Sequence, residues 1–167
     1  VLERVPRRWD LLALRAQALA RLDRWDEAGA AVDEAERLPE ADRGHLDVVR
    51  LEILCERKDW PGVIERAARV LADHPDLDPS MRDHVLSMRG LGELESGRPE
   101  VAVATFRAVV EGGRSGADGA RWNLAQALVS TRDLTGALVV LRDLATRRPD
   151  DAALRNRIAE LERASGS

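Results

Sequence analysis

Apolar residues recur along this chain at the spacing of one helix face, in runs separated by short polar turns. Four turns share a pattern, in which a short polar stretch is followed by a bulky or rigid residue and then by a small one. They lie at residues 22–28, 57–63, 96–102 and 131–137. An apolar stripe at helical spacing follows each turn, and another amphipathic run precedes it. The pattern therefore predicts a helix–turn–helix unit that occurs four times.

Prolines and the distances between turns indicate the length of each unit. The last residues of successive turns lie 35, 39 and 35 positions apart. Pro39, Pro75 and Pro149 follow three of the second helices, and proline cannot continue a helix. We therefore expect units at residues 9–40, 43–76, 79–112 and 118–149, and then an amphipathic helix at 151–164. Asp78, which precedes Pro79, is predicted to cap the helix that follows it.

The spacing and the residue types resemble tetratricopeptide repeats, whose unit is a pair of antiparallel helices of about 34 residues. The resemblance covers nearly the whole chain. Residues 122–128 carry it best for a first helix, and Ala102, Phe106 and Val109 carry it best for a second. It implies an all-α fold, a right-handed superhelical solenoid of antiparallel helix pairs that a C-terminal capping helix closes.

Small residues in this pattern let two helix backbones approach closely. The expected contacts are Ala16 with Ala28, Gly90 with Ala102 and Ala125 with Ala137. The second unit departs from the pattern, because Leu51 and Val63 stand where small residues are expected. We therefore expect its two helices to splay slightly.

The ends of the chain and one loop carry further expectations. Residues 1–6 match the tail of a second helix, and no Met begins the chain. We therefore expect a single repeat array that is a piece of a longer, bacterial protein. The glycine-rich segment 112–119 is predicted to be the most flexible point and a hinge. A phosphate-binding loop is not favoured there, because the segment lacks the Lys-Ser/Thr ending and no strand precedes it.

The composition excludes several classes of protein. A net charge of −4 and 44% hydrophobic residues are typical of a soluble, folded chain rather than a disordered one. No apolar run is long enough to span a membrane, and the single Cys55 cannot form a disulfide within the chain. The acidic balance and the scarcity of basic doublets argue against nucleic acid as a partner. We expect a cytoplasmic protein, or a periplasmic one if the full-length protein has a signal or an anchor.

Catalytic and metal-binding patterns give no candidate site. His45 and Cys55 lie ten residues apart on one predicted helix, about 15 Å along its axis, which is too far to share a metal ion. Asp76 and Asp78 begin like a calcium loop, but Met81 stands where that loop needs glycine. No Gly-X-Ser-X-Gly motif occurs. The sequence therefore predicts no enzyme, no metal and no cofactor.

The resemblance implies a concave groove, lined mainly by the first helix of each pair, that binds an extended peptide or a helix of a partner protein. The residues that it places in the groove are Ala13, Gln17, Val48, Glu52, Cys55, His84, Ser87, Met88, Leu91, Trp122, Asn123 and Gln126. Asn123 and Gln126 are the strongest candidates, because amides at these positions in the family hold a peptide backbone. Two alternatives stay open: a local or inter-repeat hydrogen bond for Asn123, and a place in the inter-repeat core for Trp122.

The groove positions also indicate which ligand is disfavoured. Family members that hold acidic C-terminal tails use a clamp of Lys, Asn and Arg. The corresponding places here carry Ala13, Gln17, Val49, His84 and Met88, so cations for a terminal carboxylate are missing. A partly apolar partner segment suits the groove better.

Three functional hypotheses follow. The first is an adaptor or scaffold that binds a partner protein in its groove. The second is a substrate-recruiting or regulatory arm of a larger multidomain enzyme. The third is self-association through exposed repeat ends, especially at the start of the chain.

Overall fold

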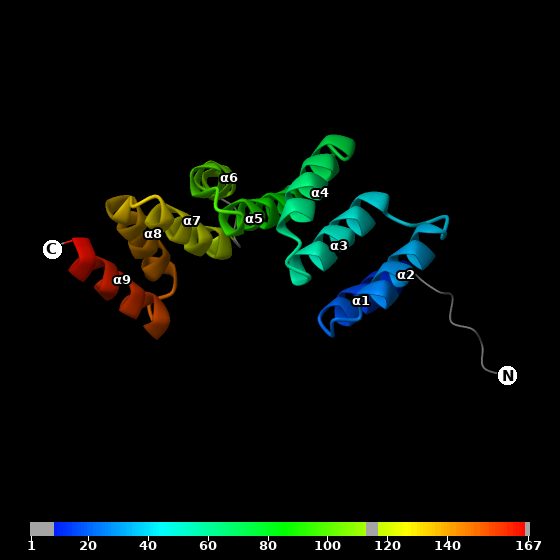
Figure 1. Cartoon of the computed structure of the whole chain (residues 1–167), viewed down its shortest axis with the longest axis horizontal. Helices are drawn as coiled ribbons and strands as arrows, with labels where there is room; N and C mark the ends of the chain where they lie inside the picture. Colours follow the sequence, from blue (N-terminus) through cyan, green and yellow to red (C-terminus); the bar gives the residue numbers. More distant parts are fainter. Residues whose placement is uncertain (1–8, 113–116, 166–167) are drawn as a thin grey trace. The chain divides into compact units, whose positions relative to one another are not determined.

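The fold is all-α, as the sequence predicts. The computed structural model describes residues 9–112 and 117–165, and these residues form nine α-helices and no strand (Figure 1). The helices are α1 (Trp9–Ala20), α2 (Trp25–Glu36), α3 (Arg43–Glu56), α4 (Trp60–Asp73), α5 (Pro79–Glu95), α6 (Pro99–Glu111), α7 (Asp118–Ser130), α8 (Leu134–Arg147) and α9 (Ala152–Ser165). Two expectations fall outside the described residues: the helix tail at residues 1–6 and, for residues 113–116, the predicted hinge.

The chain divides into two compact units, residues 1–88 and 89–167. In unit 1, helices α1 and α2 pack together, α3 packs against both, and α4 packs against α3. In unit 2, α6 packs against α7, α7 against α8, and α8 against α9. Helix α5 contributes residues to both units. Each unit therefore consists of helices packed on their neighbours in the chain.

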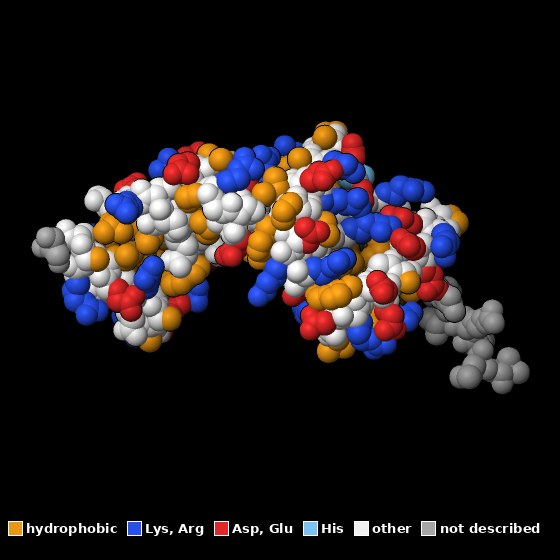
Figure 2. All heavy atoms as spheres, in the orientation of Figure 1, with side chains coloured by type: hydrophobic (Ala, Val, Ile, Leu, Met, Phe, Trp, Pro, Cys, Tyr) orange, Lys and Arg blue, Asp and Glu red, His pale blue; other side chains and the backbone are white. Residues whose placement is uncertain are grey.

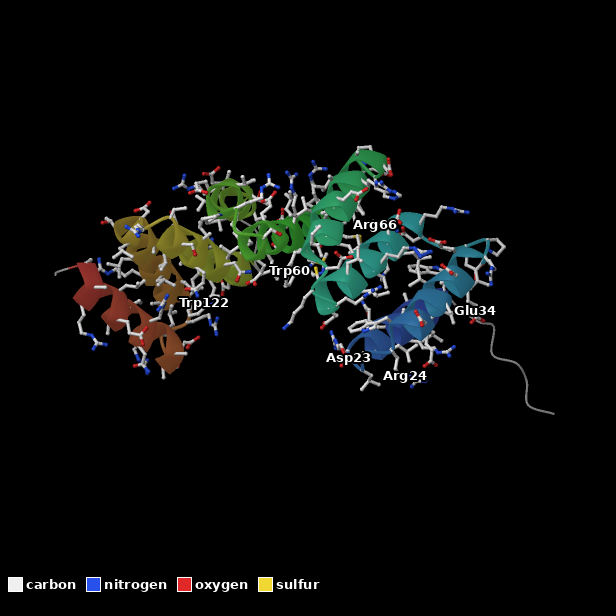
Figure 3. The ribbon with its side chains drawn as sticks, viewed as in Figure 1. Asp23, Arg24, Glu34, Trp60, Arg66 and Trp122 are labelled. Carbon is white, nitrogen blue, oxygen red and sulfur yellow. The ribbon has the colours of Figure 1, made fainter. Side chains whose placement is uncertain are left out.

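The four turns within the helix pairs share one backbone conformation. One residue in each turn has a positive φ angle, and it lies five positions before the small or apolar residue that ends the turn. These residues are Asp23 (58°), Lys58 (58°), Gly97 (72°) and Arg132 (64°). In each turn the next N–H bonds to the carbonyl five residues back, as in Arg24 N to Leu19 O at 3.0 Å. This is the Schellman motif, which ends a helix by a left-handed residue. Figure 3 labels Asp23 and Arg24 in the first of these turns.

Aspartates cap two of the second helices. The Asp59 side chain accepts a hydrogen bond from Gly62 N at 3.2 Å, and Asp133 accepts one from Gly136 N at 2.8 Å. A Cβ atom at Gly62 would lie only 2.6 Å from an Asp59 carboxylate oxygen. Glycine at this position therefore gives the capping side chain room.

Small residues fill the core of unit 1 between α1 and α2. Ala16 and Ala28 are both fully buried in one cluster that also contains Val32, Leu46 and Val49. In the second pair the equivalent positions hold Leu51 and Val63, which are also fully buried. The second pair thus buries larger side chains at this position as completely as the first pair buries its alanines.

Gly90 in unit 2 lies against a large aromatic ring. The three atoms nearest to a Cβ placed on Gly90 belong to the Phe106 ring, at 2.8–3.1 Å. Phe106 lies one turn after Ala102 and is fully buried. Its ring lies directly over Gly90, so the glycine makes space for this aromatic side chain. The contact of Gly90 with Ala102 stays a prediction.

Two charged residues are buried in unit 2, and each has partners. Glu93 accepts hydrogen bonds from Arg89 Nε at 2.8 Å and from Thr105 Oγ1 at 2.6 Å. Arg121 donates from Nε to Asp143 at 3.1 Å. Buried charges are costly unless they are paired in this way.

Aspartates cap two further helices, and one of them is the predicted cap Asp78. Ser80 N donates to the Asp78 side chain at 2.8 Å at the start of α5, and Leu154 N donates to the Asp151 side chain at 3.0 Å at the start of α9. Helix α9 packs on α8 and buries Leu154 and Leu161. Its arginines and glutamates are largely exposed, as expected for a capping helix.

Candidate functional site

Two polar side chains, from α1 and α5, contact one carboxylate on α3 in unit 1. Gln17 Nε2 donates to Glu52 Oε2 at 2.6 Å, and His84 Nε2 lies 2.8 Å from Glu52 Oε1. Gln17 comes from α1, Glu52 from α3 and His84 from α5. We call these three residues the polar row. All three belong to the set predicted to line the groove.

Glu52 is ionised at neutral pH. Burial raises the pKa of its carboxyl, but the hydrogen bonds from His84 and Gln17 together lower the pKa by more than burial raises it. The pKa therefore lies below its ordinary value. Because an ionised carboxylate only accepts hydrogen bonds, His84 Nε2 carries the proton in this contact. A carboxylate has about four acceptor positions, so Glu52 keeps the capacity to accept from a ligand.

A pocket of about 230 Å³ lies beside the polar row, and we call it the groove pocket. Its lining residues are Gln17, Ala20, Arg21, Glu52, Ile53, Cys55, Glu56, His84 and Met88. Ala20, Ile53 and Met88 are buried apolar residues, whereas Arg21 and Glu56 are exposed. Pockets for drug-sized ligands have volumes of about 300–1,000 Å³, so this one suits a single side chain or a short stretch of peptide.

Cys55 contributes an unreactive thiol to the groove pocket. Burial, together with the negative charges of Glu52 and Glu56, raises the pKa of the Cys55 thiol to about 12. The thiolate is the reactive form of cysteine, and it is scarcely populated at neutral pH with this pKa. Cys55 therefore acts here as a small, mostly apolar wall.

Three other predicted residues of unit 1 are not in the groove pocket. Ala13 and Val48 are buried, with 2% and 4% exposure, and each belongs to a hydrophobic cluster. Ser87 is half-buried and donates its hydroxyl to the backbone oxygen of Asp83 at 2.8 Å. These residues therefore shape the helices behind the pocket and offer little surface to a ligand.

The remaining predicted residues lie in unit 2 and are half-buried. Leu91 is on α5, and Asn123 and Gln126 are on α7. Trp122, which Figure 3 labels, is on α7 as well. Gln126 Oε1 accepts a hydrogen bond from Arg157 of α9 at 3.4 Å. Gln126 thus has an intramolecular partner on the capping helix, which a ligand would have to share or replace.

Four residues of the groove pocket were missed by the sequence analysis: Ala20, Arg21, Ile53 and Glu56. A signal for three of them was available. Ala20 and Arg21 follow Gln17 by three and four positions, and Glu56 follows Glu52 by four, so each lies one helical turn from a predicted residue. The turn after each predicted residue should therefore have been included.

Comparisons with known proteins agree with this architecture. A family model described as "Tetratricopeptide repeat" matches residues 87–152. Residues 87–152 are therefore similar to tetratricopeptide repeats. Its fold is similar to solved structures of MamA: one of a MamA mutant, with a TM-score of 0.69, and one titled MamA AMB-1, with 0.68. Both are 18% identical to this chain and cover 95% of it, and the match covers 83% and 82% of those chains. No curated protein sequence matches the chain.

The described residues offer little for metal or membrane chemistry. No group of three or more His, Cys, Asp or Glu side chains among residues 9–112 and 117–165 is arranged to hold a metal ion. None of the helices in those same ranges combines the length and the apolar character that a membrane crossing requires. On the face drawn in Figure 2, acidic and basic side chains are interspersed.

Proposed function

We propose that this chain is a protein-interaction module, an adaptor or scaffold that holds a segment of a partner protein in its groove pocket. Stacked helix pairs of this repeat class present surfaces to which extended peptides or helices bind. The observation that carries the proposal is the convergence of five groove residues from three helices on one pocket. These residues are Gln17, Glu52, Cys55, His84 and Met88.

The chemistry of the groove pocket selects among partner segments. Its floor of Ala20, Ile53 and Met88 favours an apolar side chain. The ionised Glu52 beside that floor favours a hydrogen-bond donor, such as a backbone N–H or a cationic side chain. An acidic tail is disfavoured, because Glu52 and Glu56 would repel it. The matching ligand is a peptide or helix that places an apolar residue next to a donor.

A selection from a phage-displayed library of random peptides tests the proposal with a defined probe. Enriched peptides should bind the chain and lose about tenfold or more in affinity to Glu52→Gln, because a hydrogen bond to a charged group is lost. Glu40→Gln is the matched control, since Glu40 is exposed in the α2–α3 connection, and it should leave affinity unchanged. Circular dichroism would establish that both variants keep their helices.

Three outcomes would contradict the proposal. One is that no peptide is enriched over an immobilised unrelated helical protein. Another is that the enriched peptides bind the Glu52→Gln variant as tightly as the unchanged chain. The last is that affinity responds only to Asn123→Ala combined with Gln126→Ala, which would assign the binding surface to α7 in unit 2.

A further inference from the structure

A second pocket of unit 1 has a volume of about 340 Å³ and is lined by residues of α2, α3 and α4. We call it the arginine pocket, because Arg50 and Arg66 line it together with Arg57, which directly follows α3. Figure 3 labels Arg66 on α4. The other lining residues are Trp25, Gly29, Ile53 and Leu54, so none of the described residues that line the pocket is acidic. The arginine pocket therefore combines positive charge with apolar surface.

The arginine pocket lies within the array of helices and not at its first helix. Helix α3 packs against α1 and α2, and α4 packs against α3. In this register a further helix pair before α1 would pack on α1, just as α1 and α2 pack on α3. None of the described residues of α1 lines the arginine pocket. The pocket therefore stays accessible beside such a pair.

Two of the three arginines are peculiar to the second helix pair. In the register set by the four turns, the positions equivalent to Arg57 hold uncharged residues, which are Leu22, Ser96 and Thr131. The positions equivalent to Arg66 are uncharged as well, and they hold Ala31, Thr105 and Val140. The repeat thus packs without a cation at either position. Helix packing therefore does not account for Arg57 and Arg66.

Two of the arginines have carboxylate partners that lie outside the lining of the pocket. Arg50 forms ion pairs at 2.8 Å with Asp33 and with Glu36. Arg66 donates from Nη2 to Asp47 Oδ1 at 2.8 Å, and its buried Nε has no hydrogen-bond partner among the described residues. A guanidinium has five N–H donors, so both side chains keep donors for a ligand while their carboxylate partners hold them in place.

Arg57 supplies a charge that has no partner. Its side chain is exposed and forms no hydrogen bond or ion pair with another residue that the structure describes. A guanidinium matches the planar geometry of a carboxylate and binds it through two parallel hydrogen bonds. A single unpaired cation suits a single carboxylate, whereas a phosphate ester carries up to about two negative charges. The charges of the arginine pocket therefore favour a carboxylate.

Gly29 leaves open space in the wall of the arginine pocket. It lies inside α2, and no atom lies within 4 Å of a Cβ placed on it. Glycine in a helix interior costs about 1 kcal/mol relative to alanine, and no neighbouring atom here excludes alanine. The helix itself therefore gains nothing from this glycine, whereas a large side chain at this position would fill part of the pocket.

We propose that the arginine pocket binds an aspartate or glutamate side chain of a partner protein, next to an apolar residue of the same segment. The carboxylate accepts hydrogen bonds from Arg57 and Arg66, and the apolar neighbour contacts the half-buried Trp25 and Leu54. This segment is opposite in charge to the one that suits the groove pocket. Among the described residues the two pockets share Ile53 alone, so binding at one does not require the other.

An array of short peptides with a central Glu-Leu pair and random flanks, beside counterparts that carry Gln-Leu, tests this site. A set of the Glu peptides should bind the whole chain about tenfold or more tightly than their Gln counterparts, because a charged hydrogen bond is gained. Arg57→Gln should weaken binding of these peptides by about tenfold or more. Arg37→Gln is the matched control, since Arg37 is exposed at the end of α2 and does not line the pocket, and it should leave affinity unchanged.

A variant that fills the pocket tests the location of the site without a change of charge. Gly29→Leu should weaken binding of the Glu peptides by about tenfold or more, because its side chain occupies their place. Ala30→Leu adds the same side chain at the neighbouring, exposed position of α2, and it should leave affinity unchanged. Circular dichroism and urea unfolding would establish that each variant is folded. If Gly29→Leu does not fold, the comparison of Arg57→Gln with Arg37→Gln still decides the outcome.

Four results would overturn the proposed site. The first is that no Glu peptide binds more tightly than its Gln counterpart. The second and third are that folded Arg57→Gln, or folded Gly29→Leu, binds the Glu peptides as tightly as the unchanged chain. The last is that counterparts with phosphoserine in place of glutamate bind about tenfold more tightly than the Glu peptides, which would assign the arginine pocket to a phosphopeptide instead.

Discussion

The left-handed residue in each turn predicts that substitution by glycine stabilises the fold at that residue and destabilises it at the residue before. Lys58 has a φ of 58° in its turn, and its side chain is exposed. A non-glycine residue in the left-handed region costs about 1–2 kcal/mol, whereas glycine adopts it freely. Glycine also has more freedom in the unfolded chain, which offsets about 0.4–1 kcal/mol of that gain. Lys58→Gly should therefore stabilise the fold by about 0.5–1 kcal/mol.

The adjacent residue provides the matched control. Arg57 has a φ of −71°, in the right-handed region, so Arg57→Gly gains nothing in the folded state and should cost about 0.5–1 kcal/mol. Gly97→Ala tests the same idea in reverse. Gly97 has a φ of 72°, and no atom lies within 4 Å of an added Cβ, so the change should destabilise through the backbone alone.

Urea and thermal unfolding followed by circular dichroism measure these effects. A change of 1 kcal/mol shifts the Tm of a chain of this size by about 2–4 °C. The expected order of stability is Lys58→Gly above the unchanged chain, with Arg57→Gly and Gly97→Ala below it. A Lys58→Gly variant that is less stable than the unchanged chain would refute the assignment of a left-handed turn residue there.

Three further predictions concern the core and the groove pocket. Gly90→Ala should lower the urea midpoint, because overpacking against Phe106 costs about 1–3 kcal/mol and the better helix propensity of alanine returns only about 1 kcal/mol. In a double-mutant cycle, the smaller side chain of Phe106→Leu should reduce the cost of Gly90→Ala. The pKa of Glu52 is lower in the folded chain than its value of about 4.5 in the unfolded chain, so the ionised carboxylate stabilises the fold. This stability is fully present above pH 4.5 and is lost as the pH falls through the folded pKa. The urea midpoint of the Glu52→Gln variant should therefore decline less at acid pH than that of the unchanged chain. Cys55, with its pKa raised to about 12, should react with a disulfide reagent at neutral pH far more slowly in the folded chain than in urea, and equal rates would contradict its burial.

Local signals in the sequence were sufficient for the helices and most of their ends. The apolar stripes, the prolines and the caps at Asp78 and Asp151 act over a few residues, so they can be recognised without tertiary contacts. The left-handed conformations at Asp23, Lys58 and Arg132 could not be recognised, because none of these residue types favours a positive φ as strongly as glycine does. In those turns the packing of the helix pair overrides the local preference.

The candidate site was predicted in part. Helical spacing placed Gln17, Glu52 and His84 on the first helices of their pairs, and the structure brings them together. The burial of Ala13 and Val48 was not predicted, because a shift of about one residue around a helix moves a side chain from the groove to the core. That rotation is set by contacts with neighbouring helices.

The sequence by itself determined the helices, the turns between them and the repeat to which they belong, because periodicity and capping are properties of short segments. Only the tertiary structure decided that one carboxylate joins three helices and that Phe106 covers Gly90. These features depend on distances between residues about 15 to 35 positions apart. Such distances are fixed when helices pack, and they leave no pattern along a single helix.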